Sequence, residues 1–348
     1  MEVDRQKKAE VLQHTIKHID ITAHDPRELI AAYQEMSFSA RELGHACEIF
    51  ERMLQDERCT IILTIAGSSS AAGCMQAYVD LLRHNMVDIV VATGATVVDM
   101  DFFEALGFSH YRGTQFADDR QLRDLYIDRI YDTYIDEEEL QHCDAAIKEI
   151  ADTLEPKPYS SRAFIAEMGR WLATHPGRAV KTNSLVQVAH ELGVPVFCPA
   201  FSDSSAGFGL VAHQAERPGR HLSIDSVRDF HELTRLKIAA EDTGLLMIGG
   251  GSPKNFAQDT VVCAEILGHD VPMHKYSVQI TVADVRDGAC SSSTLKEAMS
   301  WGKVDASAEQ MVFAEATLAL PLLAAYGYHN GSWKNRPRRQ LARSLDVA

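Results

Sequence analysis

Short apolar runs alternate with longer stretches that have helical patterning. The runs are rich in β-branched side chains, or alternate between apolar and polar positions, as strands do. They are residues 60–66, 87–93, 195–200, 245–248 and 276–283. Helix-like sequence follows each of them, as in residues 71–85. This alternation predicts an α/β fold, a doubly wound and mostly parallel sheet with helices on both faces.

The predicted strands end in glycine and in small polar residues. These ends are Gly67-Ser68-Ser69, Thr93-Gly94-Ala95-Thr96, Ser202-Asp203-Ser204-Ser205, Gly249-Gly250-Gly251 and residues 287–293. Ligands of such sheets bind outside the carboxyl ends of the strands, and small residues let them approach the backbone. We therefore expect these loops to gather into one polar pocket.

Three parts are expected along the chain. Residues 1–54 form an N-terminal helical segment, residues 55–330 form a single α/β domain, and residues 331–348 form a loose basic tail. Between residues 101 and 161 the alternation is interrupted. There Asp136 and Glu139 predict a helix start, with Asp136 as the N-cap and Glu139 at the third helical position.

The net charge is −15, which argues against a nucleic-acid partner and is compatible with small cationic substrates. Seven cysteines are spread singly without a CxxC pair, as in proteins of a reducing compartment. No apolar run approaches the roughly 18 residues that span a bilayer. We expect a cytoplasmic protein without a membrane partner. No metal is expected, because His14 and His18 form only a lone helical pair.

Ser300-Trp301-Gly302-Lys303 carries the most informative chemistry. An amine beside an indole loses hydration, which favours the neutral form that attacks a carbonyl or imine carbon. The alternative is a surface lysine whose charge suits a helix C-terminus. Asp287, Glu297 and Trp301 all lie within 16 residues of Lys303. Carboxylates beside an aromatic wall suit a polyamine, whose ammonium ends and methylene chain they would bind.

The glycine triplet at residues 249–251 leaves two interpretations open. It is neither a Walker loop nor GxGxxG, yet a strand-to-helix turn of this kind can bind a dinucleotide phosphate. It can equally be a tight turn. A serine hydrolase is not indicated, because Gly-x-Ser-x-Gly does not occur.

Five segments together resemble the deoxyhypusine synthase family, over about residues 55–327. The Ser-Trp-Gly-Lys block is the most specific of them. The segments are His84-Asn85-Met86-Val87-Asp88 leading to Thr93-Gly94, Val194 to Ala200 leading to Asp203, Thr243-Gly244 leading to the glycine triplet and Lys254, Glu297 to Lys303, and Ala314 to Leu323.

The resemblance implies a Rossmann-like fold and a homotetramer with NAD and active sites at dimer interfaces. In the family reaction, NAD takes hydride from spermidine and the active lysine attacks the resulting imine. 1,3-Diaminopropane is released, and the aminobutyl group then passes to an acceptor amine and is reduced. In deoxyhypusine synthases the acceptor is a lysine of the hypusine-bearing translation factor.

The resemblance also implies roles for individual residues. Lys303 is the covalent nucleophile, and Glu297 and Trp301 bind the polyamine. The residues expected to contact NAD are Ser68, Thr93, Gly94, Asp203, Gly250, Gly251, Ala283, Asp287, Ala314 and Glu315.

Several positions that bind the amine depart from the eukaryotic enzymes. Asn255 replaces a histidine, and an asparagine is no base near neutral pH. Phe208 and Cys290, the latter followed by Ser291, stand where those enzymes have aspartates, and Gln279 replaces a tyrosine. The segment Ser252-Pro253-Lys254-Asn255-Phe256 is similar to that of the prokaryotic deoxyhypusine synthase-like branch.

The expected function is therefore NAD-dependent aminobutyl transfer from spermidine through Lys303 to a protein lysine. Asn255 is expected to help position the amine, and Ser291, Gln279, Phe208 and Cys290 to line its site. Three alternatives remain. They are a homospermidine synthase that uses putrescine as the acceptor, an NAD-dependent amine dehydrogenase in which Lys303 is only structural, and a non-catalytic protein that keeps the fold.

Overall fold

A six-stranded parallel sheet is the centre of the molecule. The computed structural model describes residues 3–174 and 183–346. The strands of the sheet are β1 (Cys59–Ile65), β2 (Ile89–Ala92), β7 (Val196–Phe197), β9 (Asp242–Ile248), β10 (Tyr276–Thr281) and β11 (Glu309–Phe313). Every pairing between neighbouring strands is parallel, which confirms the predicted fold class.

The strand order is β11-β10-β9-β1-β2-β7. From β1 the chain builds outward through β2 to β7, then returns to the other side of β1 and continues through β9, β10 and β11. This is the order of a dinucleotide-binding sheet, in which the direction of winding reverses between the first and fourth strands. The switch point of this sheet therefore lies between β1 and β9.

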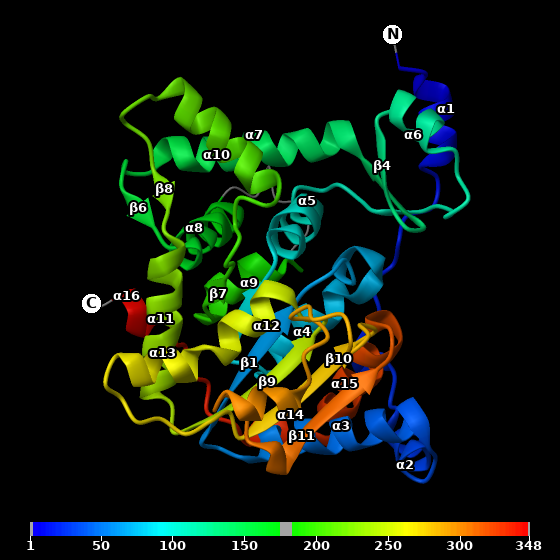
Figure 1. Cartoon of the computed structure of the whole chain (residues 1–348). Helices are drawn as coiled ribbons and strands as arrows, with labels where there is room; N and C mark the ends of the chain where they lie inside the picture. The colour runs from blue at the N-terminus through cyan, green and yellow to red at the C-terminus, as the bar shows by residue number, and fades with distance from the viewer. Residues whose placement is uncertain (1–2, 175–182, 347–348) are drawn as a thin grey trace.

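Helices cover both faces of the sheet (Figure 1). Ile61 and Leu63 of β1 belong to one core cluster, whereas Ile62 belongs to the cluster on the opposite face. The first face carries α3 (Phe38–Gln55), α4 (Met75–Arg83), α9 (Leu185–Leu192) and α15 (Ala316–Asn330). The second carries α11 (Ser226–Ala239), α12 (Gly251–Gln258), α14 (Leu295–Ser300) and α16 (Ala342–Asp346), with α13 (Thr260–Ile266) against α11.

A second group of elements lies beyond one side of the sheet, where α7 and α10 run side by side (Figure 1). Here β3, β5 and β4 form an antiparallel sheet, and β6 pairs with β8. The elements outside the central sheet are α1 (Arg5–Val11), α2 (Arg27–Gln34), α5 (Phe103–Ala105), β3 (Tyr111–Arg112), α6 (Asp119–Asp124), β4 (Ile127–Ile130), β5 (Thr133–Asp136), α7 (Glu137–Thr153), β6 (Pro158–Tyr159), α8 (Ser161–Thr174), α10 (Ser205–Glu216) and β8 (Ser223–Ile224).

The helix start predicted at Asp136 is confirmed. Its Oδ1 accepts hydrogen bonds from the backbone amides of Glu138 and Glu139 at 2.9 and 3.3 Å. Within residues 3–174 and 183–346, we find no helix that combines the length and apolar character needed to cross a membrane.

The expectation of a loose basic tail is wrong. Arg336 is buried, and its guanidinium lies 2.6 Å from Asp88 Oδ2 and donates to the carbonyl oxygen of Asn85 at 2.5 Å. A charged run is normally solvated, but here Asp88 provides a buried counter-ion before β2. The tail is thereby fixed beside the amino ends of β1 and β2.

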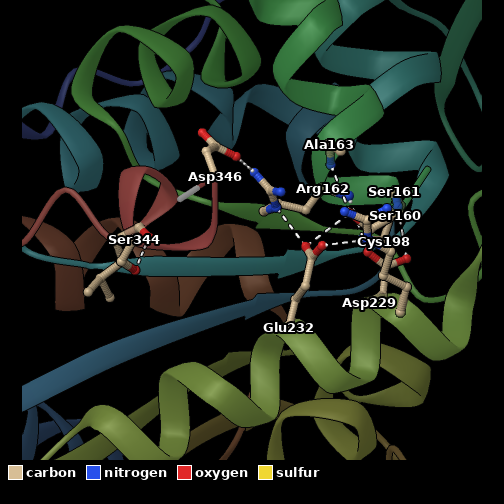
Figure 2. Close-up of polar contacts among 11 residues, drawn as sticks. Ser160, Ser161, Arg162, Ala163, Cys198, Asp229, Glu232, Ser344 and Asp346 are labelled. Atoms are coloured by element: carbon tan, nitrogen blue, oxygen red, sulfur yellow. Dashed lines mark hydrogen bonds and ion pairs between the residues drawn. The ribbon is translucent and has the colours of Figure 1, made fainter. Parts of the chain in front are cut away.

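The end of the tail joins a polar network between α8 and α11 (Figure 2). Arg162 donates to Glu232 at 2.7 Å and to Asp346 of α16 at 2.9 Å. The backbone amide of Arg162 donates to Asp229 at 3.2 Å, and burial raises the pKa of Asp229 to about 7. Ser161 Oγ accepts from the amide of Cys198 at 2.8 Å, so the network also fixes the end of β7.

Candidate functional site

Lys303 is positioned by the end of α14. The helix begins after Thr294, whose hydroxyl accepts from the amide of Glu297 at 3.0 Å. It ends at Ser300 with Trp301 as the C-cap, and Gly302 then adopts a left-handed conformation with φ +69°. The backbone amide of Lys303 donates to the carbonyl oxygen of Ala298 at 3.1 Å. A glycine suits this turn because other residues are strained at positive φ.

The side chain of Lys303 lies between an acid and an aromatic ring. Its Nζ is 2.5 Å from Asp259 Oδ1 and 5.0 Å from the centre of the Trp301 ring. The side chain is 12% exposed, whereas Trp301 is 65% exposed. The contact expected between lysine and indole is present, but the carboxylate was not foreseen.

These side chains open onto a cavity of about 520 Å³, called the Lys303 cavity below. It is bounded by α11, the junction of α12 and α13, the loop 288–293, and α14. Its lining residues are Phe230, Asn255, Gln258, Asp259, Val262, Cys263, Ile266, Gly288, Ala289, Cys290, Ser293, Glu297, Ala298, Trp301 and Lys303. Lys303, Asn255, Glu297, Trp301 and Cys290 were predicted from the sequence, and the structure brings these five together.

A second lysine stabilises the wall of this cavity. Lys254 is 1% exposed, and its amine donates to the carbonyl and hydroxyl oxygens of Ser293 at 2.5 and 3.0 Å. Burial lowers the pKa of Lys254 to about 8. Lys254 thus links α12 to the loop that carries Cys290 and leads into α14.

A second cavity of about 380 Å³ lies at the switch point of the sheet. It is lined by residues at or just after the carboxyl ends of β1, β9, β10 and β11. They are Ala66, Gly67, Ser68, Ser69, Gly249, Gly250, Ile280, Thr281, Val282, Ala283, Ser291, Ala314, Glu315 and Ala316. Of the ten residues predicted to contact NAD, this switch-point cavity gathers Ser68, Gly250, Ala283, Ala314 and Glu315.

A close backbone contact lies between the linings of the two cavities, so the strand ends do not form the single pocket that was expected. A Cβ on Gly250 would lie 2.4 Å from Ser291 Cα. The amide of Gly251 donates to Ser291 Oγ at 3.0 Å. Buried Gln279 donates from Nε2 to the carbonyl oxygens of Gly249 and Ser291 at 3.1 and 3.0 Å. Gln279, predicted to line the amine site, instead joins the two loops.

The glycine triplet makes a tight turn between β9 and α12. The amide of Gly249 donates to the carbonyl oxygen of Ile280 at 2.8 Å, and the amide of Gly251 is taken by Ser291. Gly249 and Gly251 have φ of +71° and +57°. Two of the amides that a phosphate would need are already bonded, so any ligand here is bound mainly by the surrounding loops.

Other predicted residues lie outside both linings. Phe208 is on α10 and is 69% exposed. Asp287 accepts from the amide of Ala289 at 2.7 Å and from the hydroxyl of Ser292, and so shapes the loop beside Cys290.

Thr93 and Gly94 follow β2. The hydroxyl of Thr93 lies 3.1 Å from that of Thr96, which donates to the carbonyl oxygen of Gly67 at 3.4 Å. A Cβ on Gly94 would lie 2.6 Å from Ser204 Oγ, which places the Asp203 loop beside this turn.

The described part of the chain contains no group of three or more His, Cys, Asp and Glu side chains arranged to hold a metal ion. His18, considered earlier with His14, lies 2.7 Å from Glu104 Oε2 instead. This contact attaches the N-terminal segment to the domain.

The deoxyhypusine synthase family model matches residues 28–327. The chain belongs to the deoxyhypusine synthase family. The matched range includes the glycine turn, α14 and Lys303.

Curated relatives agree over nearly the full length. A deoxyhypusine synthase-like protein of Coxiella burnetii is 67% identical and covers 96% of this chain and 95% of its own length. One from Caulobacter vibrioides is 60% identical, with 97% and 92% covered. "Probable deoxyhypusine synthase 2" of Methanosarcina mazei is 38% identical, with 88% and 87% covered. The prokaryotic deoxyhypusine synthase-like branch is thereby shown.

A solved structure supports the fold. A crystal structure from Entamoeba histolytica, assigned to deoxyhypusine synthase, superposes with a TM-score of 0.59 at 21% identity. The superposition covers 90% of this chain and 97% of that one. At this identity the likeness concerns the fold alone.

Proposed function

We propose that this chain is an NAD-dependent aminobutyl transferase that moves the aminobutyl group of spermidine through an imine on Lys303 to a protein lysine. The observation that carries the proposal is the placement of Lys303. Its amine faces a cavity, 2.5 Å from a carboxylate and 5.0 Å from an indole. Lysine is the residue that forms such imines, and family membership favours the covalent role.

NAD would occupy the switch-point cavity. The residues present fit this group. The cavity lies where parallel sheets of this order bind dinucleotides, and most of its lining residues have small side chains. A Cβ on Gly67 would meet nothing within 4 Å, so this lining residue leaves open space. Glu315 provides a carboxylate suited to a ribose hydroxyl. When bound, NAD supplies the oxidation of the donor amine and the later reduction of the product.

The donor would be held by the wall of the Lys303 cavity. Glu297 provides an anion for an ammonium end, and the exposed ring of Trp301 provides a face for the methylene chain. Apolar Phe230 and Val262 line the same cavity and exclude water from part of it. The acceptor in this proposal is the lysine of the hypusine-bearing translation factor.

A second candidate has putrescine as the acceptor and homospermidine as the product. Among the described residues that line the Lys303 cavity, Asp259 and Glu297 are the only carboxylates. Exposed Cys290 stands where the eukaryotic enzymes carry an aspartate. Asp259 pairs with Lys303, so Glu297 is the carboxylate of this lining that suits an ammonium end of a small diamine. A dehydrogenase acting on another amine is the third candidate.

A homotetramer is also part of the proposal. Phe208 and Val211 on α10 are 69% and 68% exposed. Apolar side chains exposed together on one helix favour a protein interface. Light scattering on the purified protein measures the mass of the assembly, and a monomer at all concentrations would contradict a tetramer.

The function is tested by an assay that measures all of the expected products in the same reaction mixture. Purified protein is incubated with spermidine and NAD, and either the translation factor or putrescine is added. We expect 1,3-diaminopropane together with an aminobutyl-modified factor lysine, and only traces of net NADH. Homospermidine instead would select the small acceptor, and steady NADH accumulation would select the dehydrogenase.

Two variants control this assay. Lys303→Arg keeps a positive charge but cannot form an imine, so transfer should fall by at least roughly 1,000-fold, well within the losses that follow deletion of a catalytic nucleophile. Lys296→Arg changes an exposed lysine of α14, the helix that precedes Lys303, and should leave transfer within about twofold. Transfer by Lys303→Arg at the wild-type rate would overturn the covalent proposal.

A further inference from the structure

Asp259 connects the two residues that were expected to act on the amine. It lies at the junction of α12 and α13 and lines the Lys303 cavity. Its Oδ1 is 2.5 Å from Lys303 Nζ, and its Oδ2 accepts a hydrogen bond from Asn255 Nδ2 at 2.8 Å. The carboxylate is 30% exposed, so it is held on both oxygens and still reaches the cavity.

This arrangement fixes the orientation of Asn255. An ionised carboxylate only accepts hydrogen bonds, so the amide NH₂ of Asn255 must face Asp259. The Oδ1 of Asn255 is then the atom that can accept a hydrogen bond from an amine in the cavity. Asn255 has no basic group of its own, so any base for the reaction must be another side chain.

Among the titratable side chains around the Lys303 cavity, Asp259 is the best placed to act as the base. Lys254 is buried and donates to Ser293. Glu297 and Cys290 also line the cavity, where both side chains are exposed. A general base must lie within hydrogen-bond reach of the group that it deprotonates, a heavy-atom distance of up to about 3.2 Å. Asp259 Oδ1 lies 2.5 Å from Lys303 Nζ and meets this requirement.

We propose that Asp259 is the proton acceptor of Lys303 and that it orients Asn255 toward the substrate amine. The inference rests on the proposed function and adds a catalytic residue to it. The base is thus an acid on the turn between α12 and α13, one helical turn after Asn255.

The transfer step balances with this assignment. The ammonium of Lys303 passes one proton to Asp259, and its lone pair then forms a bond to the carbon of the protonated substrate imine. The lysine nitrogen gives a second proton to the departing nitrogen. The bond from carbon to the departing nitrogen breaks with its electron pair, and the amine leaves neutral. Lys303 ends as a protonated imine and Asp259 as a carboxylic acid, so total charge, protons and oxidation level are unchanged.

An aldehyde tests this step without NAD. Butanal condenses with an amine to an imine and releases water, and cyanoborohydride reduces the imine to a stable butyl group. Peptide mass spectrometry then compares the rate of butylation at Lys303 with that at exposed Lys296 in the same sample. For Asp259→Asn we expect Lys303 to react roughly 100-fold more slowly than in the wild type, with Lys296 unchanged.

The direction of the change separates a base from a mere counter-ion. If Asp259 only balanced charge, its removal would leave more of the amine neutral and would speed the reaction. For Asp259→Ala, added formate should restore at least a tenth of the lost rate, because a small carboxylate can enter the space that the side chain leaves. Thermal unfolding confirms that both variants are folded.

The outcomes also separate this inference from the proposed function. Wild-type butylation in Asp259→Asn, with aminobutyl transfer intact in the unmodified protein, would overturn the proton acceptor and leave the function standing. No adduct on Lys303 of the wild type, either with butanal or with spermidine and NAD, would overturn both.

Discussion

At the scale of single residues, Lys303 has two neighbours that act on it differently. Asp259 holds the amine by charge at 2.5 Å, whereas the Trp301 ring shields one side of it from water. The acid orients the nitrogen, and the ring limits its hydration. Both neighbours lie on separate short segments, so the geometry of the nitrogen depends on the turn at Gly302 as well as on the fold.

The reactivity of the Cys290 thiol provides a test of the Lys303 cavity. Cys290 is exposed on its wall, whereas Cys47, Cys143 and Cys198 are buried and burial raises the pKa of their thiols. Iodoacetamide should therefore modify Cys290 at least tenfold faster than these three, since the thiolate is the reactive form. Peptide mass spectrometry measures the rates.

The group that iodoacetamide adds to Cys290 should occupy part of the Lys303 cavity. Alkylation of Cys290 should reduce butylation of Lys303, and in Cys290→Ser the reagent should no longer have this effect. Equal labelling of buried and exposed thiols, or full Lys303 reactivity after labelling, would contradict the position of Cys290.

The residues of the site were only partly predictable. Lys303, Trp301 and Glu297 share one short segment, so their chemistry could be recognised from the sequence. Asp259 lies far earlier in the chain and meets Lys303 only after α12, β10 and α14 have packed. Its sequence signal, an acid one helical turn after Asn255, is too common to be noticed without the fold.

At the scale of elements, the turn between β9 and α12 decides how the two cavities are separated. Gly250 lets the loop at Ser291 pass close to the turn, and Gln279 joins both loops from β10. The loop is thereby held against the sheet, with one cavity on each side. A change at Gly250 should therefore affect both.

Two substitutions in the same turn distinguish a collision from backbone strain. Gly251→Ala places a methyl group at φ +57°, 4.0 Å from Pro253 Cδ and thus without a collision, and should cost about 1 kcal/mol of unfolding free energy. Gly250→Ala places its Cβ 2.4 Å from Ser291 Cα and should cost about 3 kcal/mol or more. It should also weaken NAD binding at least tenfold.

Urea unfolding and calorimetric titration with NAD measure these effects. The contact between the turn and the 291 loop would be contradicted if Gly250→Ala were as stable as Gly251→Ala and bound NAD as the wild type does.

Five strands of the central sheet were predicted, and β11 was not. Glu309 and Gln310 begin this strand with polar side chains, because it lies at the edge of the sheet where one side is open. An edge strand lacks the continuous apolar run that reveals a buried one. The helix expected over residues 71–85 is interrupted: Ser70–Cys74 forms a short π-helical segment in which Gly73 adopts φ +108°, and α4 follows over Met75–Arg83.

At the scale of the whole molecule, a buried lysine makes stability depend on pH. Lys237 is 1% exposed and donates to Thr243 Oγ1 at 2.8 Å, and that oxygen lies 2.8 Å from His274 Nδ1. Burial lowers the pKa of Lys237 from 10.5 to about 8. Between pH 8 and 10.5 the unfolded chain thus binds more protons at this position, so its contribution to stability rises with pH.

Lys237→Met isolates this contribution. The unfolding free energy of the variant minus that of the wild type should be largest near pH 7 and should shrink by about 3 kcal/mol between pH 8 and 10.5. Urea unfolding of both proteins at matched pH values measures the difference. The contributions of the other titrating groups cancel, because both proteins share them. A difference that stays constant over this range would contradict the buried ammonium.

The tail shows why the arrangement of the whole chain could not be predicted. Its arginines have the pattern of a solvated tail, but Arg336 meets Asp88 and the carbonyl of Asn85, more than 240 residues earlier in the chain. Local sequence contains no sign of such a partner. The order of the sheet, in contrast, follows from alternating strands and helices, which is a local pattern.

Reductive trapping with spermidine tests the central claim most directly. The protein is incubated with spermidine and NAD, treated with borohydride and digested, and the peptides are analysed by mass spectrometry. We predict an aminobutyl group on Lys303, dependent on both spermidine and NAD, and none on Lys296 or in Lys303→Arg. Product formation without any adduct on Lys303, or with an adduct on another lysine, would contradict the covalent role of this residue.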